Sequence, residues 1–147
     1  MEKIIQGNLN QNDPKRRGWF AGNFMDEDSP FKTDDFELQW RKLKAGEEKP
    51  NLGTQKVAKT MGILVYGKFE FNFPKENKLD PAKGGASGRV CRKGRSSAAS
   101  NYSGKKITLE KEGEFVFFDA GVAHSWKVIE DTLLVSIRWP SIPGDQK

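Results

Sequence analysis

The 147-residue sequence contains very little cysteine and histidine. Its one cysteine, Cys91, has no second cysteine to pair with, so an internal disulfide framework is excluded. Its one histidine, His124, excludes any site that needs two or three imidazole groups. The sequence also lacks the run of about 18 apolar residues that a membrane-spanning helix requires. Residues 1–6 do not form the apolar stretch of a signal peptide, so we expect a cytoplasmic protein.

The length and composition fit one globular domain that covers residues 1–147. Hydrophobic residues make up only 35% of the chain, but ten Phe and four Trp add large apolar side chains. A chain of this size can bury roughly two-thirds of its unfolded surface, which is enough for one core. We expect residues 1–34, which are mainly polar, to form an N-terminal arm and loop.

The positive charge of the chain is concentrated in residues 75–106. This segment holds nine basic and two acidic residues, so its net charge is +7 and the rest of the chain carries −2. It contains few apolar side chains and cannot bury enough surface to become ordered, so we predict a flexible basic insertion. The simpler interpretation is a solvated loop without a ligand. The alternative is a salt-dependent contact with an anion, a nucleotide or RNA.

Alternating polar and apolar residues predict a series of short strands separated by turn residues. The expected strands are residues 35–41, 60–66, 68–73, 106–109, 114–118, 124–128 and 132–139. Gly67 and residues 130–131 are expected to be turns, and residues 68–73 place three Phe on one face. No window of 11 residues has a helical period. This pattern predicts an all-β protein, an antiparallel sandwich or barrel.

One segment of the C-terminal half resembles the second motif of the cupin superfamily. It reads Gly113, five residues, Asp119, Ala120, Gly121, two residues and His124. The family has the same frame, with proline usual at the position of Asp119. The strand, glycine and strand at residues 62–71 are similar to the family's first motif, and the basic insertion lies where cupins have a variable segment.

The resemblance covers about residues 35–140 and has several implications. It implies a cupin-type antiparallel jelly-roll β-barrel with a ligand pocket inside, and usually a homodimer. Cupins usually bind a divalent metal through three His and one Glu, and His124 matches one of these ligands. Thr60 stands at the position of the Glu, however, and residues 52–56 contain no His but include a repelling Lys56. One imidazole leaves too few ligands for iron, zinc or manganese, so we expect no metal and no other cofactor.

Three roles remain open for His124: a packed core residue, a hydrogen-bonding group for a ligand, and a general base. Some metal-free cupins, the sugar-nucleotide epimerases, use a His–Asp pair as base and a Tyr as acid. In this sequence the resemblance points to Asp119 and to Tyr66, which is the only Tyr in a predicted strand. General acid–base catalysis needs hydrogen-bond geometry that a sequence does not contain.

Further candidates follow from strand phase. Trp126 lies two residues after His124, so the two side chains share one face of a strand. Trp126 is either core or an aromatic wall for a ligand, and Trp40 has the same two interpretations on its own strand. Arg138 is either a surface or dimer-interface ion or an anchor for an anion in the pocket. The candidate ligand-binding residues are His124, Trp126, Tyr66, Trp40 and Arg138.

The leading functional hypothesis is a cupin-like protein that binds a small organic ligand without the usual metal site. The alternative is a small cupin enzyme, either a metal-free epimerase or isomerase with His124 as base or a metal enzyme with atypical ligands. The expected partners are a small organic ligand and a second copy of the chain. A nucleic acid is the less favoured partner, through the basic insertion.

Overall fold

The computed structural model describes residues 4–74 and 104–146. The predicted basic insertion, except for its last three residues, and Cys91 lie outside the described residues. The described chain is almost entirely β-structure, with two short 3-10 turns at Leu9–Gln11 and Pro14–Arg16. The strands are β1 (Trp19–Ala21), β2 (Glu37–Leu43), β3 (Glu48–Gly53), β4 (Lys59–Phe73), β5 (Lys105–Leu109), β6 (Phe115–Phe118) and β7 (His124–Trp139).

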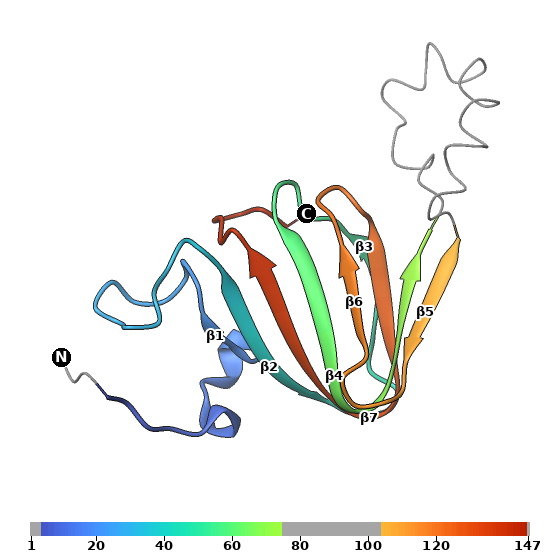
Figure 1. Ribbon diagram of the computed structural model, residues 1–147, viewed down its shortest axis with the longest axis horizontal. Coiled ribbons are helices and arrows are strands. Elements are labelled where there is room, and N and C mark those ends of the chain that lie inside the picture. Colours follow the sequence, from blue (N-terminus) through green and yellow to red (C-terminus); the bar gives the residue numbers. More distant parts are fainter. Residues whose placement is uncertain (1–3, 75–103, 147) are drawn as a thin grey trace, which may run out of the picture.

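Strands β4 and β7 form the centre of the fold. They pair antiparallel from Lys59 opposite Trp139 to Asn72 opposite Ser125, and the register shifts in the middle of both strands. Figure 1 shows that both strands bend there, so that one sheet folds into two limbs that face each other. The sequence analysis predicted turns at Gly67 and at residues 130–131. These positions are instead part of continuous strands that bend.

The bend requires glycine at position 67. Gly67 has a φ of +105°, and a Cβ added to it would lie 2.3 Å from the carbonyl oxygen of Asp131. The hydroxyl of Thr132 binds across the bend: it accepts from the backbone N–H of Lys68 at 3.1 Å and donates to the carbonyl of Glu130 at 2.7 Å. The two long strands therefore change direction together.

The two limbs contain different edge strands. The first limb holds β1, β2, the C-terminal half of β7, the N-terminal half of β4, and β6. The second limb holds β3, the N-terminal half of β7, the C-terminal half of β4, and β5. The predicted antiparallel all-β class is confirmed. The described strand pairings do not close the sheet into the expected barrel. The edge strands of the first limb, β1 and β6, do not pair with the edge strands of the second limb, β3 and β5.

Aromatic side chains form much of the core between the limbs. The three Phe of residues 68–73 share one face, as predicted, and all three are buried. The rings of Phe69 and Phe71 lie 4.8 Å apart, and those of Phe71 and Phe73 lie 6.0 Å apart. Phe118 from β6 packs edge-on against Phe71 at 6.0 Å and so joins the limbs.

The first limb has an apolar outer face, and its inner face carries both core residues and polar side chains. Two cross-strand rows lie on the outer face, and every member is half-buried or exposed. The rows are Trp40, Val135, Ile63 and Phe115, and Leu38, Ile137, Met61 and Phe117. The alternate positions of the same strands carry Gln39, Arg41, Ser136, Arg138 and Thr60.

The N-terminal residues pack on the first limb. The segment predicted as an arm and loop contains β1, which pairs with β2, and Asn10 accepts a hydrogen bond from the indole N–H of Trp40 at 2.9 Å. No helix in residues 4–74 or 104–146 is long and apolar enough to cross a membrane. The cytoplasmic location stays a prediction.

Candidate functional site

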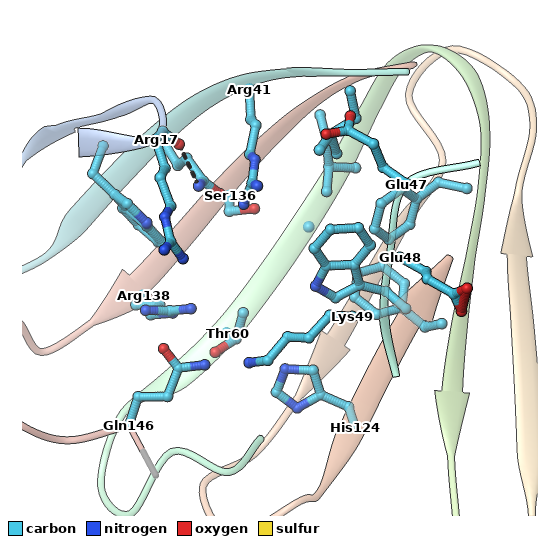
Figure 2. Close-up of a pocket in the computed structure, with 18 of the residues that line it drawn as sticks. Arg17, Arg41, Glu47, Glu48, Lys49, Thr60, His124, Ser136, Arg138 and Gln146 are labelled. Carbon is cyan, nitrogen blue, oxygen red and sulfur yellow. Dashed lines mark hydrogen bonds between the residues drawn. The ribbon is translucent and has the colours of Figure 1, made fainter. Parts of the chain in front are cut away.

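A cavity of about 490 Å³ lies between the two limbs, and side chains from both limbs line it. Apolar groups on its wall include Phe69, Phe71, Phe118 and Trp126. Polar side chains also line the cavity, and Figure 2 labels most of them. The polar lining residues are Arg17, Gln39, Arg41, Glu47, Glu48, Lys49, Thr60, His124, Ser136, Arg138 and Gln146.

His124 is the first residue of β7 and is only 5% exposed. Its ring lies 4.4 Å from the ring of Phe118 and 6.4 Å from that of Phe73. Burial lowers the pKa of His124 to about 4, and the nearby charges of Lys49 and Arg138 contribute in the same direction. The ring is therefore neutral near pH 7. Its Nδ1 lies 3.3 Å from the carbonyl oxygen of Val122. We assign the proton to Nδ1, which leaves Nε2 as an acceptor.

Trp126 forms the apolar wall of the second limb. Its ring packs on Phe69 at 5.5 Å, and the guanidinium carbon of Arg41 lies 5.5 Å from its ring centroid. Arg41 belongs to β2 in the first limb, so this contact crosses the cavity. Lys49 of β3 lies directly opposite Trp126 of β7 in the register of the second limb.

Arg138 lies on the inner face of the first limb and is mostly buried. Its Nη1 is 3.6 Å from Oε2 of Glu37, and its guanidinium carbon lies 4.4 Å from the centroid of the Trp19 ring. Burial lowers the pKa of Arg138, while Glu37 acts in the opposite direction. The Nε of Arg138 is buried and has no hydrogen-bond partner in the described part of the chain. The same is true of the hydroxyl of Thr60, the residue opposite Arg138 on β4.

Lys49 brings a further positive charge into the cavity. A Cβ on Gly53 would lie 2.7 Å from Nζ of Lys49, so glycine at position 53 leaves space for the ammonium group. Burial lowers the pKa of Lys49, and the charges of Arg138, Arg17 and Arg41 lower it further. Within residues 4–74 and 104–146, neither Lys49, Arg17 nor Arg41 forms a salt bridge.

The structure brings three of the five candidate residues to the cavity: His124, Trp126 and Arg138. Tyr66 lies near the bend, is 47% exposed and does not line the cavity. Trp40 is on the outer face of the first limb and does not line it either. The side chain of Asp119 is exposed and accepts from the backbone N–H of Ala120. The His, Asp and Tyr of the epimerase interpretation are therefore not assembled around this cavity.

Sequence reasoning missed several cavity residues, most importantly Lys49. It lies in β3, which was not predicted because residues 48–53 contain a proline and no apolar alternation. Arg17 comes from the loop before β1, where Gln39 donates to its carbonyl oxygen at 2.8 Å. Gln39, Arg41 and Ser136 did carry a signal. They form the polar phase of alternating strands, and Ser136 has the same phase as Arg138.

The groups around His124 do not suit a divalent cation. No cluster of three or more His, Cys, Asp or Glu side chains that could hold a metal occurs in the part of the chain that the structure describes. The charged groups that act on His124 are the cations Lys49 and Arg138, and Thr60 is not a carboxylate. Metal chemistry therefore gives no basis for a mechanism here, and a low metal content stays a prediction.

Comparison with known proteins shows similarity of structure only. No protein-family model and no curated protein matches the sequence. The chain is similar to a protein with a double-stranded β-helix domain from Klebsiella pneumoniae, with a TM-score of 0.56, 13% identity and coverage of 100% of this chain and 96% of that one. It is similar to KdgF from Halomonas sp., with a TM-score of 0.51, 16% identity and coverage of 76% and 74%. A cupin superfamily protein from Desulfitobacterium hafniense matches with a TM-score of 0.48, 12% identity and coverage of 73% and 69%.

The two similarities with TM-scores above 0.5 define the class of fold. The two folded-over limbs correspond to the double-stranded β-helix, and the chain has a cupin-like fold. The resemblance that the sequence analysis drew from the segment between Gly113 and His124 is confirmed at the level of the fold.

Proposed function

We propose that this protein is a cupin-like small-molecule-binding protein and that its ligand occupies the cavity between the limbs. The observation that carries the proposal is the cavity itself, about 490 Å³ in volume and lined from both limbs by aromatic and polar side chains. The volume lies within the range of roughly 300–1,000 Å³ of small-molecule sites, and the lining is richer in polar groups than such sites usually are.

Each of three residues has a distinct part in the proposed site. Trp126 offers a flat apolar surface backed by Phe69. His124 offers an acceptor at Nε2, because its other ring nitrogen contacts the carbonyl of Val122. Arg138 lines the cavity and offers guanidinium donors that can bind ligand oxygens. Removal of the His124 hydrogen bond by His124→Ala should weaken binding by about 1–2 kcal/mol.

The test is native mass spectrometry of freshly purified protein, which detects a co-purified ligand as added mass. We expect added mass on the wild type and on Trp40→Phe, the matched control from the outer face. We expect Trp126→Ala to lose it. Equal retention by Trp126→Ala and by Trp40→Phe would contradict binding in the cavity.

The enzyme alternative has less support. A general base works best when its pKa lies near the working pH, and burial holds the pKa of His124 at about 4. Tyr66, the acid of that interpretation, is exposed and does not line the cavity. No other Tyr lies in the described residues.

We also propose a homodimer that forms through the outer face of the first limb. Two rows of four apolar side chains cross four strands there without a charge. Phe115 is 59% and Phe117 is 44% exposed, so these two rings alone offer about 200 Å² of apolar surface. With the other six side chains the face provides a large part of the roughly 800 Å² per partner that a stable interface buries. A second copy carries the same uncharged face.

Sedimentation velocity tests the dimer. Ile63→Glu puts a charge in the middle of the outer face, and Ile129→Glu puts the same charge on an exposed position of the second limb. We expect Ile63→Glu to be monomeric and Ile129→Glu to remain dimeric. A monomeric wild type at micromolar concentration would contradict the proposal.

A further inference from the structure

We propose that the ligand is a small organic anion, whose carboxylate or phosphate oxygens bind among Lys49, Arg138 and Arg17. This inference rests on the proposed function and specifies the chemistry of the ligand. Carboxylates and phosphates share the oxygens that arginine and lysine donors recognise.

The first support is the arrangement of charge. Basic side chains from separate parts of the chain reach one end of the cavity: Arg17 from the N-terminal loop, Lys49 from β3 and Arg138 from β7. Figure 2 shows their nitrogen atoms directed toward a common space beside Thr60 and Gln146. The two acidic lining residues, Glu47 and Glu48, are exposed, and Figure 2 shows the carboxylate of Glu48 directed away from Lys49.

The second support is a pair of buried polar atoms without partners. The Nε of Arg138 and the hydroxyl of Thr60 belong to residues that lie opposite each other on β7 and β4. Neither atom has a hydrogen-bond partner among the described residues, although both are buried. Buried donors are nearly always satisfied in proteins. Both residues line this end of the cavity, so a ligand oxygen bound there lies beside their side chains, while the two unpartnered atoms themselves have almost no exposed surface.

The third support is the position of the Lys49 ammonium. It lies over Gly53, where any larger residue would displace it, and the positive charges of Arg138, Arg17 and Arg41 act on it. Like charges held together destabilise the empty protein, and a bound anion removes this repulsion. The arrangement therefore favours the bound state over the empty one.

The aromatic wall next to Lys49 indicates the rest of the ligand. The Trp126 ring forms the wall there, with Phe69 behind it and the Arg41 guanidinium above it. These contacts suit a flat or apolar group. The inferred ligand is thus a small acid that combines an oxyanion with a planar or apolar body.

Four probes test the chemistry of the head group by isothermal titration at one fixed low salt concentration. Benzoate, phenyl phosphate and neutral benzamide share a ring, and inorganic phosphate lacks it. We expect binding of benzoate, phenyl phosphate or both, with benzamide at least about tenfold weaker because it lacks the charge-assisted bonds. The first two probes distinguish a carboxylate from a phosphate ligand, and inorganic phosphate measures the contribution of the ring.

Two matched variants locate the bound anion. Lys49→Met removes the charge and keeps most of the side-chain volume, and Lys42→Met makes the same change at an exposed position of β2. We expect Lys49→Met to weaken anion binding at least about tenfold and Lys42→Met to leave it unchanged. We also expect the ligand-free Lys49→Met protein to melt at the same or a higher temperature than the wild type. A structural role for Lys49 would instead lower that temperature.

Three results would overturn the inference. If benzamide binds as tightly as the anions and Trp126→Ala abolishes its binding, the cavity binds small molecules but does not select anions, and only the proposed function survives. If anions bind equally to wild type and Lys49→Met, the anion site lies elsewhere. If no probe binds at 10 mM, the anion inference fails; a neutral co-purified ligand would then still support the proposed function, and an empty protein would overturn both.

Discussion

His124 should make the stability of this protein depend on pH in a defined window. Its pKa is about 4 in the folded protein, because of burial, against 6.5 for an unperturbed histidine. Between these values the unfolded state binds more protons than the folded state, so acidification favours unfolding. The folded protein should lose stability as the pH falls from about 6.5 to 4. The difference of about 2.5 units corresponds to roughly 3 kcal/mol.

The assay is urea unfolding at constant ionic strength at pH 4, 5, 6 and 7. Carboxylates also titrate near the acidic end, so the informative quantity is the difference between the wild type and His124→Gln, which lacks the imidazole. We expect this difference to change by roughly 3 kcal/mol across the window. Since the chain contains one histidine, its ring protons can be followed directly by NMR. A folded-state pKa near 6.5, or parallel curves for the two proteins, would refute the reasoning.

Three further outcomes follow from the structure. Gly67→Ala should destabilise the protein by more than about 2 kcal/mol in urea unfolding, because its Cβ would clash with the backbone of Asp131. Gly121 has a similar φ, but a Cβ added there would meet no atom within 4 Å. Gly121→Ala should therefore destabilise the protein less, and equal losses of stability in the two variants would contradict the clash. Trp126→Ala should cost about 3 kcal/mol, and an unchanged urea midpoint would place the indole outside the packed wall. Plasma mass spectrometry should find less than about a tenth of an equivalent of transition metal. Near-stoichiometric metal that is lost on His124→Ala would contradict this.

The sequence predicted those strands in which polar and apolar residues alternate clearly. The alternation in residues 68–73 places Phe69, Phe71 and Phe73 on one buried face, and the structure has them there. The motif frame around His124 led to the cupin-like fold, but not to the open form of the sheet. The sequence did not predict β3, since Pro50 and polar neighbours give no strand signal and the strand exists through its pairing with β7. Gly67 is similar: a glycine with positive φ suits a turn or a bend, and only the partner strand decides between them.

The candidate site shows why strand phase alone is insufficient. The alternation along β7 places Trp126 on the same face as His124, and both residues line the cavity. Phase also separates Trp40 from Arg41, but it does not say which of the two faces inward. In the structure Arg41 lines the cavity, whereas Trp40 lies on the outer face and hydrogen-bonds to Asn10 of the N-terminal segment. The sequence did not identify Lys49 as a cavity residue, because the strand that holds it, β3, was not predicted.

The shared bend of β4 and β7 has a mechanical consequence. Both strands pass from one limb to the other there, so the angle between the limbs is set where Gly67 meets Asp131 and Thr132. The cavity lies between those limbs, with Arg138 on one and Trp126 on the other. A molecule that touches both side chains would bridge the two limbs. The residues of the bend, Gly67, Asp131 and Thr132, do not line the cavity. They still affect its width, because the bend sets how the two limbs face each other.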